Sequence, residues 1–154
     1  MDDEQFIEII VERARSWPAG YASIWYLGPV PEEYRDVLEQ ASPDHPGSLV
    51  SPESYSRYPG LQEWLVGHGR PAAAVAAMTG VDFTTAYDAI RSAVNALWIS
   101  DGLVDPKATE VWGSNPYEYA MNQPPGSAMK TNLGETLRLV LPGVLAELRG
   151  LHRE

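Results

Sequence analysis

Hydrophobic residues recur at helical spacing in three segments of the chain. The first segment runs from Asp2 to Trp17, the second from about Phe83 to Ile99, and the third from Leu133 to Leu151. Apolar residues three and four positions apart lie on one face of a helix, so each segment is predicted to form an amphipathic helix. The apolar positions that carry this prediction are Phe6, Ile9, Ile10, Ala14, Trp17; Phe83, Ala86, Tyr87, Ile90, Val94, Leu97, Trp98; and Leu133, Leu137, Val140, Leu141, Val144, Leu145, Leu148, Leu151.

The ends of the first and third segments carry start and stop signals. Asp2 or Asp3 is expected to cap the first helix, which Pro18 then ends. In the third, Asn132 followed three residues later by Glu135 is typical of a capping box. The pair Pro142-Gly143 interrupts the apolar stripe, and proline removes a backbone donor. We therefore expect a kink there, or two abutting helices.

Shorter elements are predicted between these segments. Pro31 to Ala41 is expected to be a short acidic helix, Leu61 to Leu65 one or two helical turns, and Pro71 to Thr79 an alanine-rich helix. The Pro-rich segments Ser42 to Gly60 and Gly113 to Gly126 have loop composition, the second with a packed turn around Tyr117 to Met121. Helix and strand stay open for Tyr21 to Leu27, while Leu103-Val104 and Glu110 to Trp112 are candidates for a small β-hairpin.

These elements predict a mostly α, single-domain helical bundle over residues 1–154. Its centre is a helical hairpin from Pro71 to Trp98, packed against the N-terminal and C-terminal amphipathic helices, with one small β-hairpin as an option. An alternative division separates an acidic helical part, residues 1–60, from residues 61–154, because the Pro-rich segment before Gly60 is also a candidate joint.

Part of the hairpin resembles a known DNA-binding motif. In Ala76 to Ile90, a small residue at Ala76 allows close helix approach, Gly80 accommodates a positive φ, and Val81 seals the corner. This pattern resembles a helix-turn-helix, and Arg70 to Trp112 resembles a winged-helix domain. The resemblance covers about a quarter of the chain. It implies that Thr84, Thr85, Tyr87 and Arg91 of the second helix contact DNA.

Charge weakens that implication. The chain has 21 acidic and 11 basic side chains, a formal net charge of −10, which repels a phosphate backbone. Met1 to Gly60 alone holds 11 acids and 4 bases. Nucleic acid is therefore an unfavoured partner, and a charged protein partner is expected to be basic.

Residues that carry catalysis or bind metals are sparse. The chain has no Cys, and His45, His68 and His152 stand at no metal-ligand spacing, so we expect neither a metal nor a cofactor, and no catalytic residue is assigned. His68 between Gly67 and Gly69 is the one candidate acid or base. No apolar run is long enough to span a bilayer, and acids stand where a signal peptide is basic, so we expect a cytoplasmic protein without a membrane segment.

The function hypothesis that follows is a small, acidic, non-enzymatic protein-interaction module of the inhibitor, immunity or adaptor type. Large aromatics beside acids are typical of protein-binding surfaces. The residues assigned to this surface are Trp25, Tyr26, Glu32, Glu33 and Asp36. Two alternatives remain: a helix-turn-helix transcriptional regulator, and a small enzyme with a site near His68. A homodimer through the stripe from Leu133 to Leu151 is a further option.

Overall fold

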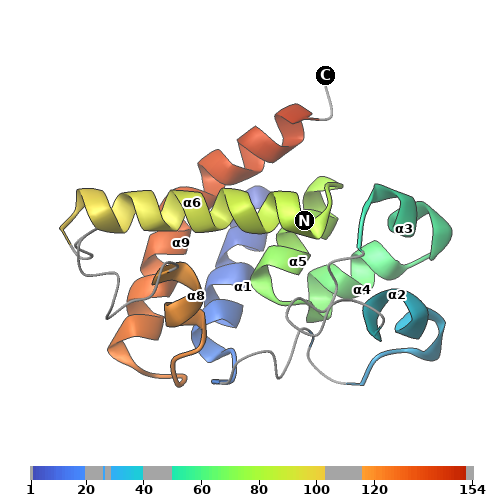
Figure 1. Cartoon of the computed structure of the whole chain (residues 1–154), viewed down its shortest axis with the longest axis horizontal. Coiled ribbons are helices and arrows are strands. Elements are labelled where there is room, and N and C mark those ends of the chain that lie inside the picture. Colours follow the sequence, from blue (N-terminus) through green and yellow to red (C-terminus); the bar gives the residue numbers. More distant parts are fainter. Residues whose placement is uncertain (1, 20–25, 27–28, 40–49, 103–115, 152–154) are drawn as a thin grey trace. The chain divides into compact units, whose positions relative to one another are not determined.

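The computed structural model of the chain describes residues 2–19, 26, 29–39, 50–102 and 116–151, and within them it is built from helices (Figure 1). In chain order these are α1 (Asp3–Ser16), the 3₁₀ helix η1 (Glu32–Tyr34), α2 (Arg35–Glu39), α3 (Pro52–Arg57), α4 (Leu61–His68), α5 (Pro71–Thr79), α6 (Phe83–Ser100), α8 (Pro116–Met121) and α9 (Ala128–Gly150). The described ranges contain no strand, and an isolated antiparallel bridge joins Tyr26 to Gly69. The prediction of a mostly α fold is confirmed. The β-hairpin expected within 103–112 lies outside the described residues.

The helices gather into two compact units. The first comprises Met1–Gly20 and Ala89–Val144, and the second comprises Tyr21–Asp88 and Leu145–Glu154. Their boundaries fall inside α6 and α9, so these two long helices each belong to both units. The division at residue 60 that the Pro-rich segment suggested is not a boundary of these units, and the single domain stays a prediction.

Three local predictions need correction. The segment expected to be a loop before Gly60 contains α3, which starts with Pro52 at its first position, where a missing N–H costs nothing. The last helix begins at Ala128 instead of Asn132, because Ser127 caps it by accepting a hydrogen bond from the Lys130 amide (3.2 Å). That helix also runs through Pro142 without a break, so it is not two abutting helices.

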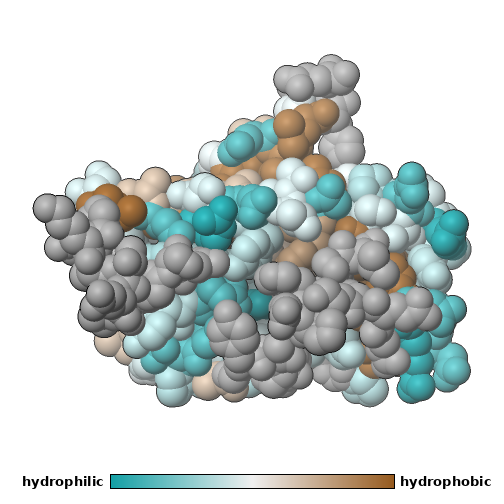
Figure 2. All heavy atoms as spheres, viewed as in Figure 1, coloured by the Kyte–Doolittle hydropathy of each residue, from teal (hydrophilic) through white to brown (hydrophobic). Residues whose placement is uncertain are grey.

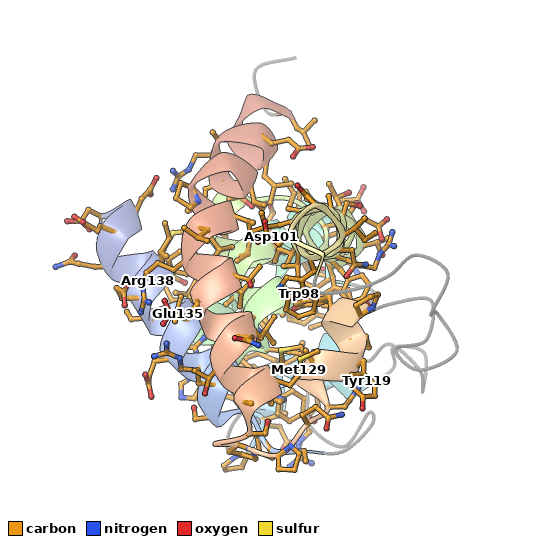
Figure 3. All side chains as sticks on the ribbon, turned by 90° about the vertical axis from the view of Figure 1, so that its left-hand side faces the viewer. Trp98, Asp101, Tyr119, Met129, Glu135 and Arg138 are labelled. Carbon is orange, nitrogen blue, oxygen red and sulfur yellow. The ribbon has the colours of Figure 1, made fainter. Side chains whose placement is uncertain are left out.

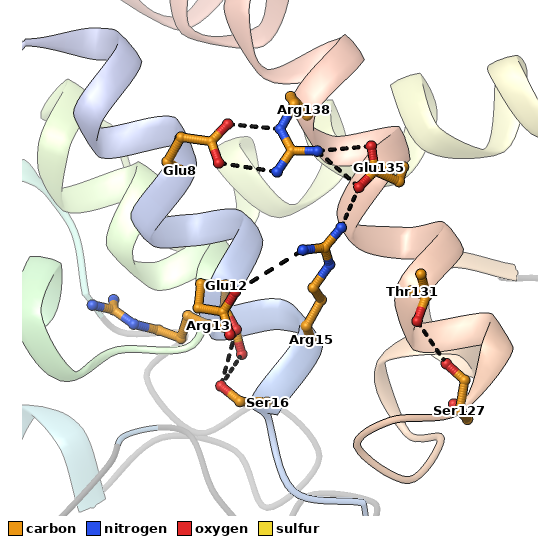
Figure 4. A network of polar contacts seen from close by, with 9 residues as sticks. All are labelled: Glu8, Glu12, Arg13, Arg15, Ser16, Ser127, Thr131, Glu135 and Arg138. Carbon is orange, nitrogen blue, oxygen red and sulfur yellow. Dashed lines mark hydrogen bonds and ion pairs between the residues drawn. The ribbon is translucent and has the colours of Figure 1, made fainter.

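In the first unit, α1 lies antiparallel to α9, and shared charges fix their register. Asp2 forms the predicted cap of α1 as part of a capping box with Gln5. Farther along, Arg138 of α9 holds Glu8 of α1 through two hydrogen bonds of 2.6 and 2.9 Å. Arg138 also binds Glu135, whose carboxylate in turn pairs with Arg15 of α1 (Figure 4). The chain's own cations therefore pair these carboxylates.

A buried lysine makes a second link within this unit. Lys130 is fully buried, and its ammonium donates to the carbonyl oxygens of Ala14 (3.1 Å) and Met121 (2.7 Å). These carbonyls belong to the last turns of α1 and α8, where helical carbonyls lack intrahelical partners and the helix dipole is negative. One cation thus caps two helix ends.

Two further polar contacts in the first unit link α6 to α9 and to α8, and Trp98 of α6 is labelled in Figure 3. The Trp98 indole donates to the Thr136 hydroxyl at 2.7 Å, which satisfies the one polar atom of a buried ring. The side chain of Asn95 accepts from the Tyr117 amide (3.0 Å) and so caps α8 from another helix. Besides Lys130, the largest fully buried side chains of this unit are Trp98, Tyr117, Phe6, Ile10, Ile90, Met121, Leu133, Leu137 and Leu141.

In the second unit, α5 is packed closely against α4. All residues of α5 except Met78 are buried, and most are alanines, which permit a short distance between helix axes. A Cβ on Gly69 would lie 2.7 Å from the carbonyl oxygen of Leu65 and 3.3 Å from the Cβ of Ala73, so the connection between the helices requires glycine. The Gln62 amide donates to the Ala77 carbonyl across the pair (2.9 Å).

The contact of Arg15 with Gly134 yields a test of the register between α1 and α9. A Cβ on Gly134 would lie 2.6, 2.9 and 3.1 Å from Nε, Cγ and Cδ of Arg15. Glycine to alanine in a helix normally stabilises by about 1 kcal/mol. In the native chain we expect G134A not to raise the free energy of unfolding, because the new Cβ collides with Arg15. In an Arg15→Ala background G134A should raise it by about this amount, as measured by urea unfolding.

Gly143 is the matched control, because it lies in the same helix with no atom within 4 Å of its added Cβ. G143A should therefore have the same effect with or without Arg15. An equal gain from G134A in both backgrounds would show that Arg15 does not lie across Gly134.

The same ion pairs predict a pH dependence. The pKa values of Glu8 and Glu135 are lowered, in each case first by the hydrogen bond from Arg138. A carboxylate whose pKa is lower in the folded chain stabilises it above the unfolded pKa and loses this contribution as pH falls through the folded value. We therefore expect Tm to fall below about pH 4.5, and to fall less in an Arg138→Gln variant.

The control is Arg57→Gln, which removes an exposed guanidinium that makes no ion pair within the described ranges. Thermal unfolding followed by circular dichroism from pH 6 to pH 3 should give this variant the native acid dependence. If Tm falls by the same amount in R138Q and in the native chain on acidification, the ion pairs of Arg138 with Glu8 and Glu135 do not cause the acid dependence.

Candidate functional site

Aromatic rings gather around Trp64 in the second unit. The His68 ring lies flat against the indole, with centroids 5.0 Å apart and planes at 15°. Tyr26 and Tyr34 contact the same indole with tilted rings, at 5.7 and 6.2 Å. Trp64 and Tyr26 are half-buried, Tyr34 is buried, and His68 is exposed, so the cluster reaches from the interior to the surface.

Local structure explains how segments distant in sequence form this cluster. Trp64 and His68 are four residues apart on α4 and therefore share one helix face. The backbone bridge between Tyr26 and Gly69 brings the tyrosine to the end of α4. The hydroxyl of Tyr34 donates to the Pro59 carbonyl at 2.8 Å, which holds this ring in its tilted contact with the indole.

The start of α4 has to be glycine for this arrangement to form. Gly60 has φ +83°, in the left-handed region that favours glycine. A Cβ at this position would also lie only 2.6 Å from the Tyr34 hydroxyl. The tight turn before α4 and the position of Tyr34 are therefore coupled.

Carboxylates lie beside the rings. Desolvation raises the pKa of the Tyr34 phenol, and the charges of Glu33 and Glu63 raise it further, which places both carboxylates near this ring. Both are exposed, and neither makes an ion pair or hydrogen bond within the described part of the chain. We call the surface formed by Tyr26, Glu33, Glu63, Trp64 and His68 the Trp64 patch.

A polar hollow of about 410 Å³ lies between α2 and α3. Its lining residues are Asp36, Val37, Ser51, Glu53, Ser54, Arg57 and Tyr58. The charged members are exposed and carry both signs, so the hollow does not select one charge. The hydrophilic character of the surface at α3 is visible in Figure 2.

The predicted protein-binding residues fall in different places. Tyr26 and Glu33 belong to the Trp64 patch, while Glu32 is exposed on η1 and Asp36 lines the polar hollow. Trp25 lies outside the described residues. Sequence reasoning missed Trp64, because the helical turns predicted for Leu61 to Leu65 ended before His68, whereas α4 continues to His68 and places both rings on one helix.

The helix-turn-helix-like hairpin has the expected backbone. Gly80 ends α5 with φ 75°, and its amide donates to the Ala76 carbonyl (2.8 Å). Asp82 then caps α6 by accepting from the Thr85 amide (2.6 Å). From α3, the Tyr55 hydroxyl donates to the Val81 carbonyl (2.9 Å), and burial raises the pKa of this phenol. The turn is thus fixed from outside the hairpin.

The predicted DNA-binding residues lie on the first half of α6. Thr84 is exposed, while Thr85, Tyr87 and Arg91 are half-buried, and Tyr87 is stacked on Phe83 at 5.8 Å. The exposed neighbour of Thr84 on the next turn is the acidic Asp88. This helix face is therefore exposed at its start, but it is not basic.

His68, the candidate acid or base, is on the surface, and its Nδ1 lies 3.1 Å from the Trp64 carbonyl oxygen. The described residues contain no group of three or more His, Asp or Glu placed to hold a metal ion. An enzyme with a site near His68 stays a prediction.

The stripe assigned to a homodimer is mostly used within the chain. Leu133, Leu137, Leu141, Val144, Leu145 and Leu148 are each at most 3% exposed. Leu139 (71%) and Leu151 (47%) are exposed instead, and Figure 2 shows hydrophobic surface at the C-terminal end of α9. A dimer through this helix would have to use the exposed residues, and it stays a prediction.

Comparison of the chain with protein-family models, curated proteins and solved structures finds no match in any of the three. Among the helices of the described ranges, none combines the length and hydropathy needed to cross a membrane. Function must therefore be argued from the residues themselves.

Proposed function

We propose that the protein is a small, non-enzymatic protein-interaction module of the inhibitor, immunity or adaptor type, and that the Trp64 patch binds a basic segment of its partner. The observation that carries this proposal is that the half-exposed rings of Tyr26 and Trp64 belong to the same cluster as two carboxylates without a described cation, Glu33 and Glu63.

The patch has the composition of an energetically important protein contact. Trp and Tyr contribute disproportionately to binding because they bury much area and lose few rotamers. Here the tilted contacts with Tyr26 and Tyr34 hold the indole before any partner arrives, which lowers the entropy cost of association.

The distribution of paired and unpaired acids favours this surface over the first unit. Glu8 and Glu135 are exposed, but Arg138 and Arg15 already bind them. A basic partner would have to compete with these cations. At the Trp64 patch no described cation has to be displaced from Glu33 or Glu63. The two carboxylates can therefore attract a basic partner without competition from the chain's own side chains.

Capture of a partner from native lysate at low and high salt tests the proposal. We expect one partner to be retained by the native chain at low salt and released as salt rises, because screening weakens exposed charge pairs. The variant E33Q/E63Q should lose most of this retention. E53Q/E147Q is the matched control, since it removes the same charge from exposed positions outside the patch and should bind like the native chain.

Equal loss in the two double variants would indicate a general charge effect instead of a site. Retention that is insensitive to salt and to E33Q/E63Q would contradict the proposal. Circular dichroism of each variant establishes that the fold is intact.

A helix-turn-helix regulator remains a second candidate, favoured by the left-handed Gly80 turn and the Asp82 cap. On this alternative, the chain shifts mixed genomic fragments in a gel at low salt, where phosphate contacts are strongest. The variant T84A/R91Q should abolish that shift, whereas A96S, an exposed change farther along α6, should not. The absence of any shift at low salt would remove this candidate.

A further inference from the structure

We propose that the Trp64 patch recognises an arginine side chain of the basic partner, with its guanidinium stacked on the indole face that His68 covers in the free chain. This inference rests on the proposed function and names the chemical group that the patch selects.

The stacking of His68 on Trp64 shows that the indole face accommodates a flat group. A flat ring lies against the indole at 5.0 Å and nearly parallel, at 15°. A guanidinium is also planar, and arginine stacks on aromatic faces in proteins. The other two rings meet Trp64 at 56° and 53°, so they brace the indole instead of competing for the same parallel position.

His68 is held in a way that permits displacement. It is exposed at the last position of α4, and its one polar contact within the described ranges is to the Trp64 carbonyl, one turn back in the same helix. Gly67 and His68 are both exposed at the C-terminal end of α4, so the imidazole can turn away from the indole into solvent. An incoming side chain can therefore replace the imidazole without moving the backbone.

The carboxylates add a preference for arginine over lysine. Glu33 and Glu63 flank the cluster, and a guanidinium offers five donors in a rigid fork while its plane still stacks. A lysine ammonium is a compact, strongly hydrated charge that does not stack. Both cations are attracted to the patch, but arginine has the advantage, because its plane can lie on the indole while its edge donates to a carboxylate.

Titration of the full-length, ¹⁵N-labelled chain with octa-arginine and octa-lysine, two peptides of equal charge, tests this inference by NMR. The indole N–H signal of Trp64, assigned through a Trp64→Phe variant, should move with octa-arginine and much less with octa-lysine. We expect octa-arginine to bind about two- to five-fold more tightly, the range of an exposed cation–π contact.

Substitution of the half-buried Trp64 could disturb folding, so a second variant, His68→Ala, changes the patch at an exposed side chain instead. H68A should bind octa-arginine more tightly than the native chain does, because the indole face is already open. Tyr119→Ala, which removes an exposed ring from α8, is the control and should leave both peptides unchanged.

The outcomes separate the two proposals. Equal affinity for both peptides, with loss of binding in E33Q/E63Q, would overturn arginine recognition and leave the basic-partner proposal standing. Weaker octa-arginine binding by H68A would also overturn it, because His68 would then be part of the contact. Failure of both peptides to bind would overturn both proposals.

Discussion

The Arg138 guanidinium joins Glu8 of α1 to Glu135 of α9, and this shared cation fixes the antiparallel register of the two helices. Single exposed ion pairs contribute little to stability, but a guanidinium that binds one carboxylate with two hydrogen bonds and a second from its own helix fixes geometry as well. Lys130 caps two helix ends nearby, so Arg15, Arg138 and Lys130 are all engaged within the first unit.

This internal use of cations determines which acids remain available to a partner. The chain has a net charge of −10, and most of its carboxylates can be attributed to solubility without assigning each one a binding role. Glu33 and Glu63 differ in that they lie near the Tyr34 ring of the Trp64 cluster and pair with no cation among the described residues. The acidic surface proposed for binding is therefore identified by its position next to the Trp64 cluster, and not by how many acidic residues it contains.

The sequence predicted the fold better than the site. Helical periodicity identified α1, α6 and most of α9, because a core-facing stripe repeats every three to four residues. Ser127 was missed as a cap because the apolar stripe begins only at Leu133, one and a half turns later. At the site, Tyr26 and Glu33 were predicted, but their proximity to Trp64 depends on a bridge to Gly69, a contact that no local pattern encodes.

Hydrogen exchange of the full-length chain, alone and with its captured partner, tests most directly the claim that the Trp64 patch is the functional surface. Amides that a partner covers exchange more slowly, while the others keep their rates. The account predicts slowed exchange in η1 and α4, from Glu32 to Tyr34 and from Leu61 to His68, with α1 unchanged. Slowed exchange confined to α1 and α9, with η1 and α4 unaffected, would contradict it.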